Sequence, residues 1–308
     1  MDFKGRHIIS IKQFTREELD YILQVANKME KYYQTSSDLL RGKILATLFF
    51  EPSTRTRLSF TSAMYKLGGQ VISLSNPEMS SISKGENLSD TISVVQYYAD
   101  VIVLRHKLEG SAKLMSEISQ VPIISGGSGT KEHPTQAMLD LLTIHNEMNG
   151  KLDGLKVALC GDLKYGRTVK SLAYALSHYN IEINFVSPSS LRMRNEVISD
   201  LKNLNVSINE YADLSEIIND MDVVYATRIQ KERFPDPADY AKVKGSYRIT
   251  VDMLDNVKEN LIIMHPLPRV EEIEYEVDKT KHARYFKQSY YGVILRMALL
   301  ALVLGVSL

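Results

Sequence analysis

The sequence predicts an α/β protein of two domains, each a parallel sheet flanked by helices. Short apolar runs alternate with segments of helical periodicity, and this alternation pauses and restarts near Gly150. Strands that alternate with helices of this length favour parallel sheets with right-handed crossovers. The most unusual polar residues directly follow apolar runs. Because ligands bind at the carboxyl ends of parallel strands, we expect the active site there, in the cleft between the two domains.

The first domain is expected to span residues 1–149. An amphipathic helix over 15–33 opens it, with Leu19, Ile22 and Leu23 on one side. Apolar runs then predict strands at 44–50, 71–74, 101–104 and 121–125, with helices at 55–67, 88–99, 111–119 and 134–149 between and after them.

The second domain is expected to span residues 150–287. Strands are predicted at 155–160, 183–186, 206–209, 223–226 and 261–264, with helices between most of them. An apolar helix at about 288–308 follows, and we expect it to complete the first domain.

Composition narrows the class of protein. The 308 residues contain 37 Lys and Arg and 37 Asp and Glu, so no net field attracts nucleic acid or an anionic membrane. A single cysteine, Cys160, excludes an internal disulfide and a cysteine-cluster metal site. The apolar stretch 293–308 is interrupted by Arg296 and is shorter than the ~20 residues of a membrane span. With no signal-peptide pattern near Met1, a cytoplasmic location is expected.

The segment from Glu51 to Arg57 (EPSTRTR) is the strongest candidate site. It lies where the strand 44–50 gives way to the helix 55–67. Free backbone N–H groups, hydroxyls and the helix dipole favour an anion at such a terminus. Arg55 and Arg57 add charged donors that match a phosphate. The alternative is a simple capping residue followed by solvated arginines.

Four arginines share a position just after an apolar strand: Arg55, Arg105, Arg167 and Arg228. Distributed over both predicted domains, they indicate a site for a ligand with several negative charges. The alternative, pairing of each arginine with a surface carboxylate, is weaker for four residues in equivalent positions than for one.

Residues 161–168 read G-x-x-x-x-G-R-T, one residue from the phosphate-binding loop of nucleotide hydrolases. Arg167 stands where that motif has lysine, and a planar guanidinium is not a neutral replacement for an ammonium. Arg167 is better suited to two-pronged binding of a carboxylate. A nucleotide hydrolase is therefore the weaker alternative.

The histidines do not predict a metal site, because no two have ligand spacing on one element. His133 is the exception that we interpret as functional, since it precedes a helix and can donate to a carbonyl oxygen. Gln136, one turn later, offers a donor and an acceptor for an amide-like group. No covalent nucleophile, metal or cofactor is expected.

Five motifs occur in order along the chain: residues 53–57 (STRTR), 133–136 (HPTQ), 162–168 (DLKYGRT), 227–233 (TRIQKER) and 265–269 (HPLPR). Together they resemble the catalytic chains of the aspartate/ornithine carbamoyltransferase family, over essentially the whole length. The last three motifs resemble the aspartate branch, because the ornithine enzymes carry His-Cys-Leu-Pro where this chain has His265-Pro266-Leu267-Pro268.

The resemblance implies transfer of a carbamoyl group from carbamoyl phosphate to L-aspartate, the committed step of pyrimidine synthesis. It assigns residues 1–149 to carbamoyl phosphate and 150–287 to aspartate. It implies catalytic roles for Arg55, Thr56, Lys84, Arg105, His133 and Gln136. Carbamoyl phosphate would be bound by these residues with Ser53, Thr54, Ser80 and the backbone carbonyls of Pro266 and Leu267.

Aspartate would be bound by Arg167, Thr168, Arg228 and Gln230, with Lys84 and Leu267. The resemblance further implies a homotrimer in which Lys84 and a preceding serine reach the neighbouring subunit's site. The family spacing selects Ser80, with Ser81 and Ser83 as alternatives. Glu51 and Arg233 resemble a pair that links the domains on closure. A separate regulatory chain that carries zinc is a partner known in this family and would not be encoded here.

Two other functions stay open from the sequence: a carbamoyltransferase for another amino acid, and an inactive homologue that binds ligand and regulates a partner. Substrate preference tests the first and turnover tests the second. The residues offer orientation of two substrates and positive charge where an oxyanion and a phosphate develop.

Overall fold

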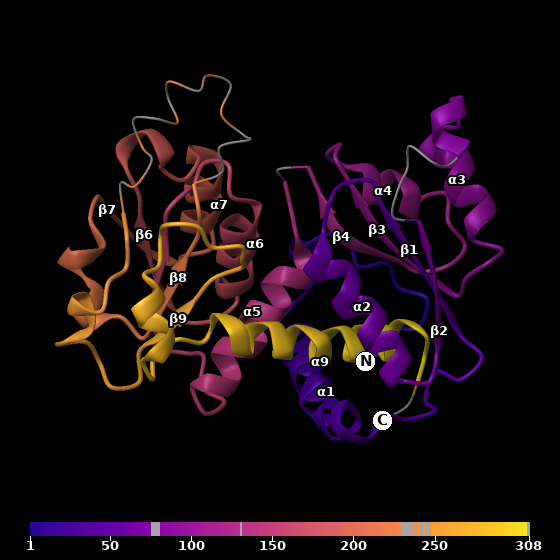
Figure 1. Cartoon of the computed structure of the whole chain (residues 1–308), viewed down its shortest axis with the longest axis horizontal. Helices are drawn as coiled ribbons and strands as arrows, with labels where there is room; N and C mark the ends of the chain where they lie inside the picture. Colours follow the sequence, from indigo (N-terminus) through magenta and orange to yellow (C-terminus); the bar gives the residue numbers. More distant parts are fainter. Residues whose placement is uncertain are drawn as a thin grey trace. The chain divides into compact units, whose positions relative to one another are not determined.

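The computed structural model describes residues 1–74, 81–129, 131–229 and 247–306, and the single residues 234, 236, 238, 240, 243 and 245. The chain divides into two compact units. Unit 1 is Met1–Leu142 with Ser289–Leu308, and unit 2 is Thr143–Gln288. Both units are parallel sheets with helices packed against them (Figure 1). The predicted fold class, two parallel sheets flanked by helices, is confirmed.

Unit 1 contains a four-stranded parallel sheet in the order β2-β1-β3-β4. Its strands are β1 (Ile44–Phe49), β2 (Gln70–Leu74), β3 (Val101–His106) and β4 (Ile123–Ser128). The chain adds β2 on one side of β1 and then β3 on the other. The carboxyl ends of β1 and β3 therefore border a topological switch point, where open α/β sheets bind ligands.

The sequence placed the end of β3 two residues too early. The apolar run ends at Leu104, but Arg105 pairs with Phe49 in the β1–β3 ladder and the strand continues to His106. Backbone pairing does not require an apolar side chain, so polarity gives no signal of where such a strand ends. Arg105 therefore lies at the carboxyl end of β3, where its backbone is held by pairing with β1.

Among the described residues, the helices that belong wholly or partly to unit 1 are α1 (Arg16–Thr35), α2 (Thr54–Lys66), α3 (Leu88–Val95), α4 (Ser111–Ser116), α5 (Pro134–Glu147) and α9 (Tyr285–Val303). The hydroxyl of Thr15 and the carboxylate of Glu18 cap α1 reciprocally. A short 3₁₀ helix, Ser81–Lys84, precedes α3.

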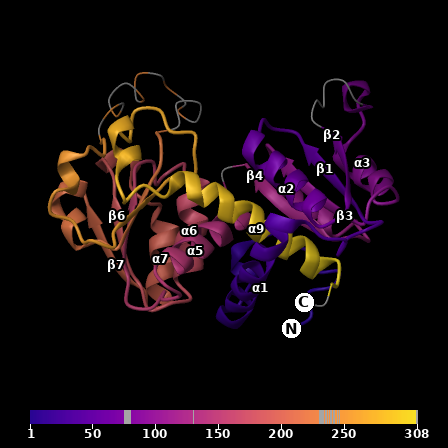
Figure 2. The same ribbon diagram turned by 60° about the horizontal axis from the view of Figure 1, so that its bottom comes forward.

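The apolar C-terminal helix is part of the core of unit 1, because nearly every residue of α9 from Ile294 to Val303 is buried. Its end lies beside the start of the chain, where the Gly5 N–H donates to the Val303 carbonyl over 2.9 Å (Figure 2). Among the described helices, none is both long and apolar enough to cross a membrane.

Unit 2 contains a five-stranded parallel sheet in the order β7-β6-β5-β8-β9. Its strands are β5 (Lys156–Cys160), β6 (Glu182–Val186), β7 (Ser207–Tyr211), β8 (Val223–Ala226) and β9 (Ile262–Met264), and its helices include α6 (Arg167–Leu176) and α7 (Asn195–Asn203). The chain runs from β5 outward to β7 and then returns to the other side of β5. The second switch point therefore lies between β5 and β8.

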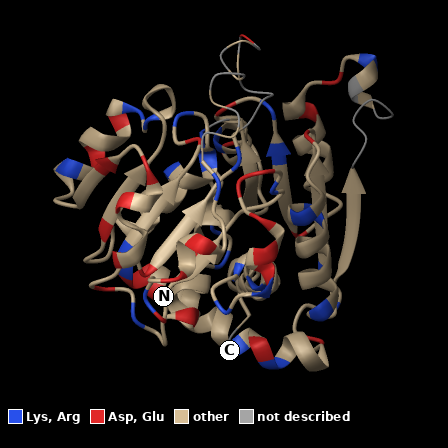
Figure 3. Ribbon diagram, turned by 60° about the vertical axis from the view of Figure 1, so that its left-hand side comes forward, with Lys and Arg blue, Asp and Glu red and all other residues tan. Residues whose placement is uncertain are grey.

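Acidic and basic residues are interspersed along the described ribbon (Figure 3). This mixture agrees with the equal numbers of acidic and basic residues, 37 of each. The charges that bear on function are therefore local ones, at the ends of particular strands.

Candidate active site

The N-terminus of α2 forms the first part of the site. β1 ends at Phe49, and Ser53 is the residue that precedes the helix. The Ser53 side chain makes no capping hydrogen bond to the helix, so its hydroxyl is not committed to the helix N–H groups. Thr54 and Arg55 are exposed, whereas Thr56 is buried against the sheet. This arrangement brings together N–H groups, a hydroxyl and a guanidinium, which are groups that bind anions.

Arg105 lies next to this helix terminus, on the adjacent strand. Its Nη1 donates to the carbonyl of Gly126 over 3.0 Å, and its Nε lies 3.5 Å from Oε2 of Glu51. These contacts tie the guanidinium to the ends of β1 and β4. Because an arginine has five N–H donors, it can keep both contacts and still bind an anion.

His133 and Gln136 form the start of α5, beyond β4. The His133 side chain is buried, and its carbonyl accepts the N–H groups of Gln136 and Ala137. The side-chain Nε2 of Gln136 donates to Oδ1 of Asp140 over 2.8 Å. Unit 1 thus brings Ser53, Arg105 and the start of α5 to one end of its sheet.

Several other predicted residues are exposed or lie outside the described part of the chain. Lys84 is exposed at the end of its 3₁₀ helix, as are Ser81 and Ser83. Ser80, Gln230 and Arg233 lie outside the described residues. Their predicted roles, including the pairing of Glu51 with Arg233, stay predictions.

In unit 2, a tight turn after β5 directs the chain into α6. Gly161 has φ +107°, and a Cβ there would lie 2.3 Å from the Thr227 carbonyl oxygen. The buried carboxylate of Asp162 accepts the N–H of Tyr165 over 2.9 Å. The turn delivers Arg167 as the first residue of α6, with its side chain 9% exposed, and Thr168 next to it.

Arg228 follows β8 on the other side of the switch point. The preceding residue, Thr227, donates from both its N–H and its hydroxyl to the Cys160 carbonyl, over 3.0 and 2.9 Å. The Tyr247 hydroxyl donates to the Thr227 carbonyl. Burial raises the pKa of Tyr247, so this phenol stays a donor at neutral pH. The segment before Arg228 is therefore fixed to the end of β5.

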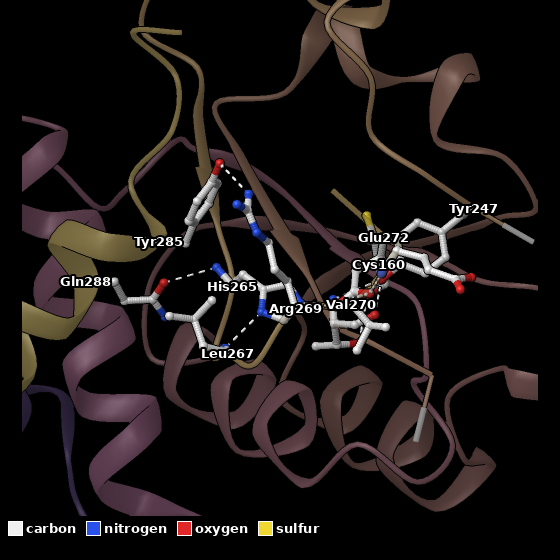
Figure 4. Close-up of polar contacts among 11 residues, drawn as sticks. Cys160, Tyr247, His265, Leu267, Arg269, Val270, Glu272, Tyr285 and Gln288 are labelled. Atoms are coloured by element: carbon white, nitrogen blue, oxygen red, sulfur yellow. Dashed lines mark hydrogen bonds and ion pairs between the residues drawn. The ribbon is translucent and has the colours of Figure 1, made fainter. Parts of the chain in front are cut away.

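The segment 265–270, which follows β9, is held by a buried histidine and glutamate (Figure 4). The ring of His265 accepts the Leu267 N–H at Nδ1 over 2.8 Å, so the hydrogen-bond network assigns the ring proton to Nε2. That Nε2 donates to Glu272 over 2.7 Å. The other Glu272 oxygen accepts the N–H groups of Val270 and Glu271, over 3.1 and 3.0 Å.

Glu272 therefore accepts three hydrogen bonds that hold the segment 265–270 in place. Burial raises the pKa of its carboxyl, but the hydrogen bonds from His265 and the backbone outweigh burial and hold the pKa below its usual value. Gln288 accepts the His265 N–H over 3.0 Å, which fixes the start of the loop (Figure 4). Pro266 and Leu267 are half-buried within the loop that these hydrogen bonds hold.

Other histidines have structural partners. The rings of His106 and Phe50 pack edge to face with 5.1 Å between their centroids, and Nδ1 of His106 lies 2.9 Å from the Ser111 hydroxyl. His282 contacts the Leu261 carbonyl over 2.8 Å. Among the residues that the structure describes, no group of three or more His, Cys, Asp or Glu side chains is placed to hold a metal ion.

Sequence reasoning missed the residues that hold the site residues in place. Asp140, Tyr247 and Glu272 were not singled out, although each contacts a predicted site residue or its neighbour. One signal was available for Asp140, which follows Gln136 by four residues on a helix and therefore shares its face. Tyr247 and Glu272 hydrogen-bond to backbone groups in loops, and loops have no periodic sequence pattern that could reveal such contacts.

Comparison with known proteins identifies the family. Residues 6–146 match the model of the aspartate/ornithine carbamoyltransferase carbamoyl-P binding domain. Residues 153–303 match the model of the Asp/Orn binding domain of the same family.

Similar proteins agree over nearly the full chain. The aspartate carbamoyltransferase catalytic subunit of Methanosarcina mazei is 57% identical, and that of Thermococcus kodakarensis is 54% identical, each over 99% of both chains. The solved catalytic subunit of M. jannaschii aspartate transcarbamoylase is 55% identical, with a TM-score of 0.89 over 96% of both chains. The Trypanosoma cruzi enzyme, solved in complex with carbamoyl phosphate and aspartate, is 40% identical, with a TM-score of 0.93 over 98% of both chains. From the two domain matches and these relatives, we conclude that the chain belongs to the aspartate/ornithine carbamoyltransferase family.

Proposed function

We propose that this chain transfers the carbamoyl group of carbamoyl phosphate to the amine of L-aspartate, giving N-carbamoyl-L-aspartate and phosphate. The observation that carries this proposal is the pair of switch points, each bordered by arginines. In unit 1, Arg55 and Arg105 adjoin the N-terminus of α2. In unit 2, Arg167 and Arg228 follow neighbouring strands. An acyl phosphate suits the first set and a dicarboxylate suits the second.

The charge of unit 2 favours aspartate over ornithine as the acceptor. Arg167 and Arg228 are cations that would repel the ammonium of an ornithine side chain, whereas each matches one aspartate carboxylate. The relatives named above support this choice, because the T. cruzi structure holds carbamoyl phosphate and aspartate together. Thr168 and the residue Gln230 are proposed to assist in binding aspartate, with Lys84 and the Leu267 backbone.

For carbamoyl phosphate, we assign the phosphate to Ser53, Thr54, Arg55, Thr56 and Arg105. The carbonyl oxygen is assigned to Thr56, Arg105 and His133. The carbamoyl NH2 is assigned to Gln136 and to the backbone carbonyls of Pro266 and Leu267. Positive charge placed at the carbonyl oxygen stabilises the tetrahedral oxyanion, and the same guanidinium of Arg105 stabilises the leaving phosphate.

The reaction then needs no covalent intermediate. The neutral aspartate amine attacks the carbamoyl carbon and forms the new C–N bond, and the C–O bond to phosphate breaks. The departing phosphate accepts the amine proton, so charge and protons balance. Orientation of the two substrates supplies much of the rate, since well-oriented reactants can gain about 7–11 kcal/mol over free ones.

The assembly and location are proposals of the same kind. We propose a homotrimer in the cytoplasm, in which Lys84, which is exposed, and Ser80 complete the site of a neighbouring subunit and Glu51 pairs with Arg233 on closure. Mixing an inactive Lys84→Ala chain with an inactive Arg105→Ala chain should then restore activity, because some sites in the mixed trimer carry neither change. Absence of any recovery would contradict shared sites. A separate zinc-containing regulatory chain is a further proposed partner, and the product would enter pyrimidine synthesis.

The test is product formation by the purified chain with carbamoyl phosphate and either L-aspartate or L-ornithine. Carbamoyl product with aspartate alone supports the proposal. Product with ornithine would mean that Arg167 and Arg228 do not select the acceptor. Binding of phosphate without turnover, with either amino acid, would favour an inactive regulatory homologue.

A further inference from the structure

Two charged side chains, Asp140 and Arg296, are buried in the core of unit 1, and Asp140 contacts Gln136. Asp140 on α5 is fully buried and accepts a 2.8 Å hydrogen bond from Nε2 of Gln136. Arg296 on α9 is 3% exposed, and its Nη1 donates to the Gly292 carbonyl over 2.9 Å. The two helices pack closely, because a Cβ on Gly292 would lie 3.3 Å from Leu139 (Figure 1). A carboxylate and a guanidinium are thus both buried on helices that contact each other.

The two charges stabilise each other. Burial lowers the pKa of Arg296 to about 10, while the nearby Asp140 charge acts in the opposite direction, so the guanidinium is still a cation at neutral pH. The guanidinium also lies 5.0 Å from the centroid of the Phe60 ring. Buried charges are costly unless an opposite charge offsets them, and the attraction of Arg296 to the nearby Asp140 reduces this cost.

A carboxylate at this place determines which way the Gln136 amide points. An ionised carboxylate only accepts hydrogen bonds, so the amide must turn its NH2 group toward Asp140. The amide oxygen then points the other way and is an acceptor. The carbamoyl group ends in an NH2, which is a donor, and acetyl phosphate has a methyl group in its place.

We propose that Asp140 is a positioning residue that fixes the Gln136 amide with its oxygen toward the substrate, and thereby makes the site select a carbamoyl group over an acyl group without N–H donors. This inference rests on the proposed function of Gln136. Without Asp140, the amide can rotate by a half-turn and present its own NH2 to the substrate NH2, donor against donor. A site built around one hydrogen bond discriminates strongly against analogues that lack it.

The test is Asp140→Asn, which keeps size and shape but can donate as well as accept. KM for carbamoyl phosphate and the inhibition constant of acetyl phosphate are measured with wild type and variant. In the variant, we expect KM for carbamoyl phosphate to rise by roughly tenfold, the effect of about one buried hydrogen bond. The inhibition constant of acetyl phosphate should change by less than about twofold. Equal weakening of both ligands would overturn the proposal, because general loosening of the site affects both alike. Asp38→Asn, an exposed substitution in the same unit, is the matched control and should change neither constant.

A second experiment asks whether Asp140 acts through Gln136. Gln136→Ala should reproduce the loss, and adding Asp140→Asn to it should cost nothing further. An additional tenfold loss in the double variant would contradict the proposal. If Asp140→Asn alone does not fold because Arg296 is left without its carboxylate, the double variant Asp140→Asn/Arg296→Met removes both buried charges and should show the same selective loss.

Failure of this inference differs from failure of the proposed function. Suppose that the wild-type chain forms carbamoyl aspartate and that Asp140→Asn keeps the wild-type preference for carbamoyl phosphate over acetyl phosphate. This result contradicts only the role of Asp140. If wild type forms no product, the proposed function fails. The stabilisation of the folded chain by carbamoyl phosphate and by acetyl phosphate, read as a shift in Tm, then still reports the preference in both proteins.

Discussion

Replacing Glu272 with glutamine tests whether one carboxylate holds the segment 265–270. Glu272 accepts from the His265 ring over 2.7 Å and from the N–H groups of Val270 and Glu271 over 3.1 and 3.0 Å. Glutamine keeps one oxygen and turns an NH2 group toward the remaining donors. Whichever way the amide lies, at least one donor in the loop faces another donor.

The expected cost follows from which donor loses its acceptor. His265 is 1% exposed, so an unmet ring N–H would cost about 1–3 kcal/mol. The variant should therefore keep the bond from His265 and lose the two bonds from backbone N–H groups. Val270 is exposed, so water can solvate its N–H group. The His265 bond loses its charge assistance and the two backbone bonds are lost in part to water, which together give a destabilisation of about 2 kcal/mol.

The pH dependence has a definite sign. The folded-state pKa of Glu272 lies below its ordinary value of 4.5, so its contribution is fully present above about pH 4.5 and is lost as pH falls through the folded pKa. Glutamine does not titrate. The difference in stability between wild type and Glu272→Gln should be constant from about pH 6 to 8 and should shrink below about pH 4.5.

Urea unfolding, followed by circular dichroism at a series of pH values, measures this difference. Glu276→Gln, a change at an exposed position four residues further along the chain, is the control and should stay within about 0.5 kcal/mol of wild type. A Glu272→Gln chain as stable as the control at pH 7 would refute the reasoning. A difference that grows on acidification would refute it as well, since it has the opposite sign.

Three further predictions follow from other parts of the site. Arg105→Ala should lower turnover by at least about 100-fold with an unchanged circular dichroism spectrum, since one oxyanion donor is worth that much; near-wild-type turnover would remove its catalytic role. Gly161→Ala should lower Tm and raise KM for aspartate, because the added methyl group lies 2.3 Å from the Thr227 carbonyl oxygen and φ is +107°; an unchanged Tm would contradict this. The hydrogen bond from Arg269 lowers the pKa of Asp278, so Asp278→Asn should lower Tm at pH 7, and the gap should narrow below about pH 3.8; a gap that is the same at pH 3 and pH 7 would be inconsistent with this pair.

Most strands were predictable because the inner strands β1, β3, β5 and β8 are buried on both faces, which gives continuous apolar runs in the sequence, whereas the edge strands β2 and β7 are exposed or half-buried. The order of the strands was not predictable. Arg105 and Glu51 meet because β1 pairs with β3 although β2 lies between them in the sequence, and the apolar runs do not indicate this pairing. The position of polar residues at strand ends nevertheless predicted which residues gather at each sheet edge.

The supporting residues were the part that sequence could not reveal. Arg296 was visible only as an interruption in an apolar run, and its neighbour Asp140 lies on a helix far away in the sequence. Glu272 and Tyr247 contact backbone groups in loops, and such contacts depend on tertiary structure and leave no periodic pattern. These residues determine the orientation of the groups that the motifs identified.

Direct transfer between two bound substrates is the central claim, and a rapid-quench measurement of phosphate release tests it most directly. Enzyme is mixed with excess carbamoyl phosphate, first without and then with L-aspartate, and phosphate and carbamoyl aspartate are both measured. Without aspartate, no burst of phosphate should appear; with aspartate, each phosphate should accompany one carbamoyl aspartate. A burst equal to the enzyme concentration in the absence of aspartate would show a covalent carbamoyl-enzyme and contradict the account.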